Sequence, residues 1–281
     1  MKRSVALRLL AEVAASQWGL VTAAQAGARG VSHLMLARLA DAGDLVRLAH
    51  GVYRDAGAPT SEHEELRSAW LSIEPARFAW ERIQDRPEGA TVSGESAARL
   101  LGIGDFRAIR HEFTVPRRRQ TQRPDVRFRT RALADPDVTV REGLPVTSIE
   151  RTIADLVESR AQLEHVARAL RDAMRRESVD VDRLTALLAP LAARNGHRKE
   201  DGRDLLQQLL ATVGLDQQSL IKQLTRATRR LLPMEVVSPT EAQELKRRAA
   251  AQSESADIAD LVRFVERLSQ LAPANTSERS T

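Results

Sequence analysis

The stretch that most constrains the fold of this chain runs from residue 19 to residue 54 and reads GLVTAAQAGARGVSHLMLARLADAGDLVRLAHGVYR. Thr22, with Gln25 three residues later, is the signature of a capping box at the start of a helix. Ser32 caps a second helix, and Gly43 ends that helix. Two short helices separated by only a few residues predict a helix-turn-helix unit.

A hairpin follows these helices directly. Residues 45–48 and 52–54 are typical of two strands, and His50-Gly51 supplies the positive φ that a tight turn needs. Residues 4–17 carry apolar side chains at helical spacing, so a further helix precedes the unit. Three helices followed by two strands predict a winged helix-turn-helix.

In such a fold the second helix of the unit enters the major groove, and the hairpin lies along the adjacent backbone. Arginine pairs with guanine or phosphate, histidine forms hydrogen bonds, and an exposed leucine contacts the methyl group of thymine. The predicted DNA-binding residues are Ser32, His33, Leu34, Arg38, Arg47, His50 and Arg54. The alternative interpretation is a helical docking module with ordinary surface arginines.

The composition fits a basic, mostly helical chain. Its 281 residues carry a formal net charge of +5, and only four of the 43 basic residues are lysines. Arginine suits the recognition of phosphates and base edges, although an arginine-rich coding bias gives the same composition. Because there is no cysteine, disulfides and cysteine-ligated metals are excluded. The N-terminal stretch lacks the continuous apolar run of a signal peptide or membrane span, so we expect a cytoplasmic protein.

A second basic region lies between residues 107 and 131, where nine arginines stand against Glu112 and Asp125. Residues 111–115 and 126–130 are typical of strands, and four of the arginines fall in the loop between them. Two interpretations are open: another surface for DNA or RNA, or a solvated hairpin tip that keeps a sheet edge soluble. The residues of this second basic patch are Arg117, Arg118, Arg119, Arg123, Arg127 and Arg129.

The remaining chain is predicted to add an α+β domain and a helical part. Ser61 with Glu64 predicts the start of the next helix. Residues 111–115, 126–130 and 138–140 predict the strands of a small mixed or antiparallel sheet. The expected fold class is α+β, mostly helical. The expected domains are a winged helix-turn-helix over 1–58, an α+β domain over 61–194, a helical extension over 195–271 and a disordered tail over 272–281.

No convergent set of catalytic groups emerges from the sequence. The six histidines lack metal-ligand spacing, and no nucleophile-elbow motif is present. The enzymatic alternative is a metal-dependent nuclease built from Asp137, Glu244 and Lys246, but its two carboxylates lie about a hundred residues apart. We therefore expect no enzyme activity, no catalytic residue, no metal and no cofactor.

Several motifs resemble one family when they are taken in order. The head, from GLVT at residue 19 to GVY ending at residue 53, resembles the winged-helix domain of AbiEi-type antitoxins. The later motifs resemble the antitoxin domain that follows in those proteins: VS at 92–93 with AA at 97–98, EFTVP at 112–116, and GLPVTS, ERT and DL between 143 and 156. The resemblance covers roughly residues 1–194.

This resemblance implies a bacterial antitoxin of a bicistronic toxin-antitoxin pair, often tied to phage defence. The winged head would bind double-stranded DNA at inverted repeats in its own promoter and repress the operon. The second domain would counteract a nucleotidyltransferase toxin, in many members without a stable complex (the type IV arrangement). The second basic patch would then serve as an additional operator contact or as part of the antitoxin surface. A plain winged-helix regulator with a ligand- or protein-docking domain is the remaining alternative.

Overall fold

The computed structural model describes residues 1–176 and 179–215. Contacts along the chain group into two compact units. The first comprises Met1–Gly102 and Phe106–Asp155, and the second comprises Ile103–Asp105 and the chain from Leu156 onward. The helices expected beyond residue 215 and the tail expected at 272–281 lie outside the described residues.

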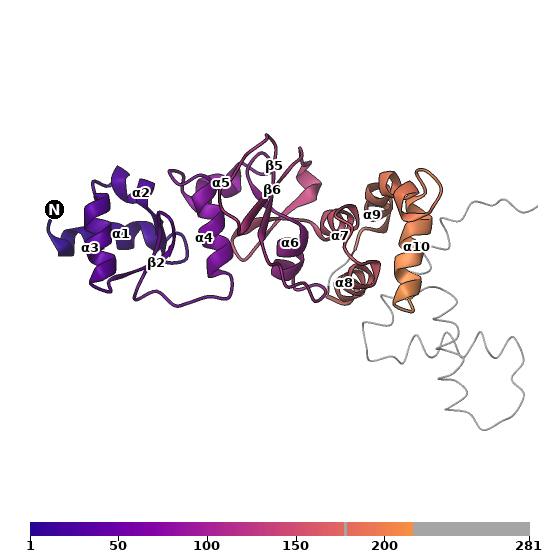
Figure 1. The fold of residues 1–281 in the computed structure, drawn as a ribbon, viewed down its shortest axis with the longest axis horizontal. Helices are drawn as coiled ribbons and strands as arrows, with labels where there is room; N and C mark the ends of the chain where they lie inside the picture. The colour runs from indigo at the N-terminus through magenta and orange to yellow at the C-terminus, as the bar shows by residue number, and fades with distance from the viewer. Residues whose placement is uncertain (177–178, 216–281) are drawn as a thin grey trace, which may run out of the picture. The chain divides into compact units, whose positions relative to one another are not determined.

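The first unit begins with the predicted winged helix-turn-helix (Figure 1). Its strands form an antiparallel sheet in the order β1-β3-β2, with a register shift between Arg47 and Ala49 of β2. The elements of this head are α1 (Arg3–Ala14), β1 (Leu20–Thr22), α2 (Ala23–Ala28), α3 (His33–Asp41), β2 (Leu45–Ala49) and β3 (Val52–Asp55).

Local capping explains why the helices of the head begin and end where they do. Thr22 and Gln25 form the reciprocal capping box that the sequence predicts. The Ser32 hydroxyl accepts a hydrogen bond from the Met35 amide at 3.3 Å, as an N-cap should. Beyond α3, Gly43 adopts a φ of +78°, a left-handed conformation that a glycine adopts without strain. The predicted caps of α2 and α3 are confirmed.

The first unit continues with a five-stranded mixed sheet in the order β6-β5-β4-β8-β7. The pairs β5·β6 and β4·β8 are parallel, and the other two pairs are antiparallel. The elements are α4 (Glu64–Ile73), α5 (Ala79–Gln84), β4 (Thr91–Val92), α6 (Gly94–Leu101), β5 (His111–Val115), β6 (Val126–Thr130), η1 (Asp135–Asp137), β7 (Val138–Arg141), β8 (Leu144–Thr147) and α7 (Ile149–Glu158).

The parallel pairing of β5 and β6 corrects one sequence interpretation. Both strands lie where the sequence predicts them, at 111–115 and 126–130, and His111 faces Val126 while Val115 faces Thr130. Because the two strands run in the same direction, the arginine-bearing connection between them is a crossover. It is not a hairpin tip.

Two helices of the first unit begin without a hydrogen bond from the side chain of their N-cap residue. Helix α4 begins at Glu64 without a side-chain cap, because the hydroxyl of Ser61 accepts a hydrogen bond from Arg67 Nη1 instead. Helix α6 takes its cap from β5, since Glu112 Oε2 accepts from the backbone amide of Glu95 at 3.1 Å. In both cases the decisive partner is distant enough that no local motif reveals it.

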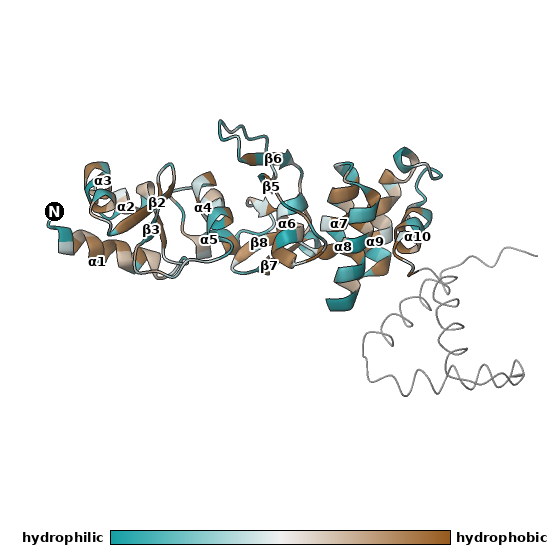
Figure 2. Ribbon diagram, turned by 60° about the horizontal axis from the view of Figure 1, so that its bottom comes forward, coloured by the Kyte–Doolittle hydropathy of each residue, from teal (hydrophilic) through white to brown (hydrophobic). Residues whose placement is uncertain are grey.

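The second unit is helical. It contains α8 (Leu163–Arg176), α9 (Val181–Leu188), the short turns η2 (Ala189–Leu191) and η3 (Ala193–Asn195), and α10 (Gly202–Thr212). Figure 2 shows hydrophobic and hydrophilic residues alternating along α8, and its apolar side chains Val166 and Leu170 are fully buried. Gly202 packs so closely that a Cβ there would lie 2.1 Å from the Thr185 carbonyl oxygen.

Candidate nucleic-acid interface

Helix α3 presents one polar and one apolar face. Leu36 and Leu39 are buried in the core of the head, with 0% and 1% of their surface exposed. On the other side His33 and Arg38 are exposed, and Leu34 has 63% of its surface in solvent. Leu34 and Arg38 therefore lie on the face of α3 that is turned away from the core of the head.

The hairpin of β2 and β3 forms the predicted wing. Arg47 and His50 are exposed, and Arg47 Nη2 lies 3.4 Å from His50 Nδ1. Gly51 makes the turn with a φ of +71°. Val46, which is not among the sequence candidates, is also exposed at 38%. The pattern of apolar and polar residues in β2 gives no signal that this valine is exposed.

Arg54, which the sequence places among the DNA-binding residues, lies opposite Val46 in the hairpin but has a largely buried side chain. Only 13% of its side chain is exposed, and its Nε lies 2.7 Å from Glu64 Oε2. Its Nη1 donates to the Ala58 carbonyl oxygen at 2.6 Å. These contacts give Arg54 a structural role that joins the wing to α4.

The arginines of the β5–β6 connection differ from one another. Arg119 donates to the carbonyl oxygen of Ile73, at the C-terminal end of α4. Arg123 pairs with Asp125 at 2.5 Å and donates to Ser72 Oγ at 3.0 Å. Arg117 and Arg118 are exposed. No hydrogen bond or ion pair engages either of these two within residues 1–176 and 179–215.

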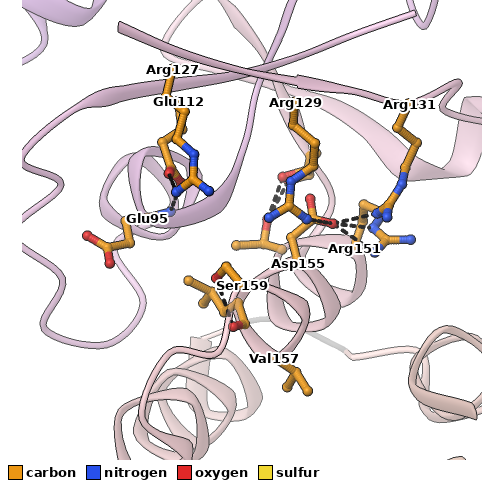
Figure 3. Close-up of polar contacts among 12 residues, drawn as sticks. Glu95, Glu112, Arg127, Arg129, Arg131, Arg151, Asp155, Val157 and Ser159 are labelled. Carbon is orange, nitrogen blue, oxygen red and sulfur yellow. Dashed lines mark hydrogen bonds and ion pairs between the residues drawn. The ribbon is translucent and has the colours of Figure 1, made fainter. Parts of the chain in front are cut away.

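The arginines of β6 face acidic groups. Side chains two residues apart lie on one face of a strand, and Figure 3 shows Arg127 meeting Glu112 while Arg129 points toward Asp155. Arg127 lies 3.1 Å from Glu112 Oε1. Arg129 and Arg131 approach Asp155 Oδ1 at 3.2 and 2.8 Å.

Asp155 is the centre of a three-arginine cluster. Arg151, one helical turn earlier on α7, also lies 2.7 Å from Asp155 Oδ1, and the carboxyl group is 1% exposed. Burial raises the pKa of Asp155, and the charges of Arg151, Arg129 and Arg131 oppose that shift. Sequence reasoning missed this cluster. The only local signal is the spacing of Arg151 and Asp155, which suits an ion pair on a helix.

The second basic patch is therefore smaller than its arginine count suggests. Hydrogen bonds from Arg123 hold the pKa of Asp125 below its ordinary value, so that pair is ionised at neutral pH. Arg119, Arg123, Arg127 and Arg129 all have partners within the fold. Arg119 and Arg127 are exposed as well as partnered, so the arginines of the patch that are exposed and have no partner within residues 1–176 and 179–215 are Arg117 and Arg118.

Of the residues proposed for a nuclease, the structure describes Asp137 alone. Asp137 Oδ2 accepts a hydrogen bond from the Ala134 amide at 3.0 Å and so closes the turn η1. Glu244 and Lys246 lie outside the described residues. Within residues 1–176 and 179–215, no cluster of histidine and acidic side chains suits a metal ion. In that same part of the chain, no helix is both long and apolar enough to cross a bilayer.

Comparisons with known proteins match both parts of the chain. Residues 8–54 match a family described as "Transcriptional regulator, AbiEi antitoxin", and residues 90–207 match the "AbiEi antitoxin C-terminal domain". The matched segments together exceed half of the 281 residues. A search of curated proteins gave no match. The crystal structure of the RV2827C protein from Mycobacterium tuberculosis is similar at 19% identity and a TM-score of 0.47, over 75% of this chain and 78% of that one.

Proposed function

This chain belongs to the AbiEi family of antitoxins and transcriptional regulators, and we propose that it represses its own operon while counteracting a nucleotidyltransferase toxin. The family is regulatory, and its members bind DNA and act against a toxin. In this proposal the target is double-stranded promoter DNA with inverted repeats, and the toxin is neutralised without a stable complex.

The exposed face of α3 carries the DNA-binding half of the proposal. A capped helix that buries Leu36 and Leu39 must present its other face to solvent, and that face holds His33, Leu34 and Arg38. We assign this face to the major groove, where arginine reads guanine and an apolar side chain contacts thymine.

The wing supplies contacts to the DNA backbone in this proposal. Arg47 and His50 are exposed at the tip of the β2–β3 hairpin. Groups that approach phosphates set the register of the protein on the duplex. Ser32 lies at the N-terminus of α3, where its side chain already caps the helix, so we assign it the placement of that helix on the DNA.

The toxin-directed half is assigned to the region that matches the antitoxin domain, residues 90–207. Arg117 and Arg118, two exposed arginines of this region, have two candidate uses: an additional contact to the operator or part of the antitoxin surface. Replacing both arginines with alanine distinguishes these uses. Operator affinity falls if the two arginines contact DNA, whereas only toxin neutralisation falls if they belong to the antitoxin surface.

The experiment for DNA binding is a fluorescence anisotropy titration of the full chain. It compares DNA from immediately upstream of its own gene with a scrambled duplex of equal length at near-physiological salt. We expect tighter binding to the upstream duplex. Equal, weak and strongly salt-dependent binding to both duplexes would contradict the proposal, because such binding reflects non-specific attraction to phosphate.

The experiment for antitoxicity is co-expression with a nucleotidyltransferase gene from the same operon. We expect this chain to restore the growth that the toxin suppresses. Sedimentation of the two purified proteins should show no stable complex. Absence of rescue by a well-expressed chain that still binds the upstream DNA would favour a plain transcriptional regulator.

A further inference from the structure

Residues 17–25, which follow α1 and comprise β1 and the first turn of α2, contact parts of the first unit far beyond the head. It meets the connection between α4 and α5, and it meets the turn between β7 and β8. The sequence predicts a domain boundary between residues 58 and 61. These additional contacts attach the head to the rest of the first unit.

The first set of contacts is polar and buried. Gln17 and Gln25 are each 1% exposed, and Gln17 Nε2 donates to Gln25 Oε1 at 2.6 Å. Gln25 Nε2 donates to the Arg77 carbonyl oxygen at 2.9 Å, and Thr22 donates to the carbonyl oxygen of Pro75. Buried amides that find partners in this way favour one arrangement, because any other leaves them unsatisfied.

The second set of contacts is aromatic. Trp18 has a positive φ of 58°, and its ring packs edge-on against Trp70 of α4, with 6.3 Å between ring centroids. The Arg67 guanidinium lies 5.0 Å from the centroid of Trp18, and its Nη2 donates to the Glu142 carbonyl oxygen at 2.9 Å. This chain of contacts links the head to the β7–β8 turn.

The packing leaves no spare room at that turn. Gly143, with a φ of +76°, lies so close to the head that a Cβ there would be 2.8 Å from Trp18 Cζ2. Atoms at that distance overlap, so the backbone of the turn and the indole ring are in direct van der Waals contact. A methyl group added at residue 143 would therefore clash with Trp18 of the head.

The exposed arginines of the second basic patch lie on a connection attached to the same region. Arg119 and Arg123 anchor the β5–β6 connection to Ile73 and Ser72, at the end of α4. The head docks on residues 75–79, which follow directly. One short stretch thus holds both the recognition head and the connection that bears Arg117 and Arg118.

We propose that residues 17–25 are a coupling element that holds the recognition head and the five-stranded sheet as one rigid body. Gln17, Trp18 and Gln25 are positioning residues: they do not touch DNA, and they set the orientation of α3. A preorganised body does not lose the entropy of aligning two flexibly linked parts when it binds one duplex. The DNA-binding consequence rests on the proposed function, whereas the rigidity does not.

The rigidity is tested on the wild-type full chain without DNA, by 15N relaxation. We expect the amides of α3 and the wing to report the same rotational correlation time as those of β5 and β8. A shorter correlation time for the head would overturn the proposal, because independently tumbling domains are what a free linker produces. This measurement requires no variant to fold, and it is independent of whether the chain selects its operator.

The coupling is tested with Gly143→Ala and the matched control Gly196→Ala. Both glycines have positive φ, so both variants carry comparable backbone strain, but nothing lies within 4 Å of a Cβ at Gly196. We expect Gly143→Ala to give the head a shorter correlation time and to weaken operator binding about tenfold, a typical coupling strength. The Gly196→Ala variant should match the wild type in both measurements.

Two outcomes would overturn the proposed coupling between the head and the sheet. One is a Gly143→Ala chain whose head remains rigid. The other is a chain whose head tumbles freely while operator affinity equals that of the wild type. If the wild type itself fails to prefer its operator, the proposed function fails, and the relaxation result still decides the rigidity.

Discussion

On α3 and the wing, Arg38 and Arg47 extend into solvent, whereas Arg129 of β6 and Arg131 just after it turn toward the buried carboxyl of Asp155. The two regions use the same side chain in opposite ways. The first pair faces solvent, and the second pair is held by a carboxylate inside the fold. An arginine count along the sequence does not separate the two uses.

Arg129 and Arg131 differ from the solvent-facing arginines because a distant part of the sequence supplies their acidic partner. Asp155 is 24 to 26 positions from these arginines, so it does not enter a local charge count. Its own desolvation makes a partner necessary, since an isolated buried carboxylate is costly. A basic surface that can bind a ligand is therefore defined by the arginines that are not held in ion pairs within the fold. The predictions below test that distinction, beginning with the largest expected effect.

Removing the central carboxylate should have the largest effect. We expect Asp155→Ala to destabilise the first unit by about 3 kcal/mol, because three clustered guanidinium groups lose their shared acceptor. Urea unfolding followed by circular dichroism measures the change. The control is Asp105→Ala at an exposed position, which should change stability by less than about 0.5 kcal/mol. Equal stability of both variants would contradict a structural role for the cluster.

Removing a solvent-facing arginine should change DNA binding and leave stability intact. We expect Arg38→Ala and Arg47→Ala each to weaken operator binding about tenfold, the value of one good base or phosphate contact. A phosphate contact should also reduce the salt slope by about one, whereas a base contact should relax sequence preference. Arg168→Ala on α8, an exposed arginine of the second unit, is the charge-matched control. Unchanged affinity in both head variants would refute the orientation assigned to α3.

Arg54 tests whether an arginine of the wing serves DNA binding or an ion pair within the fold. Its pair with Glu64 is mostly buried, with 13% and 14% of the side chains exposed. We expect Arg54→Met to cost about 1 kcal/mol of stability, measured as faster amide hydrogen exchange in β2 and β3. Glu64→Gln should show the same change, because it breaks the same pair. A loss of operator affinity with normal exchange would return Arg54 to the DNA-binding surface.

The pair of Arg123 and Asp125 should show the smallest effect, and it depends on pH. The pKa of Asp125 is lowered in the folded chain, so its contribution is present above the unfolded pKa of about 4 and is lost as the pH falls through the folded pKa. Because 44% of the Asp125 side chain is exposed, we expect less than about 1 kcal/mol. The stability of the wild type and Asp125→Asn should therefore differ at pH 7 and converge as the pH falls through the lowered pKa of Asp125. A difference that grows toward low pH would contradict the assignment.

Much of the local structure was predictable from neighbouring residues. The capping box of Thr22 and Gln25, the cap at Ser32 and the two strands at 111–115 and 126–130 all occur as expected. Each depends on groups within a few positions of one another, and such contacts form wherever the chain lies in the fold. The domain boundaries and the assigned DNA contacts stay predictions.

By itself, the sequence determined the winged helix-turn-helix and the family resemblance that the comparisons confirm. Only the tertiary structure decided that β5 and β6 run parallel, that Glu112 caps α6, and that Asp155 collects three arginines. The physical reason is the range of the interactions. Caps and periodicity act over one or two turns of chain, whereas strand direction and buried ion pairs depend on which distant segments the core brings together.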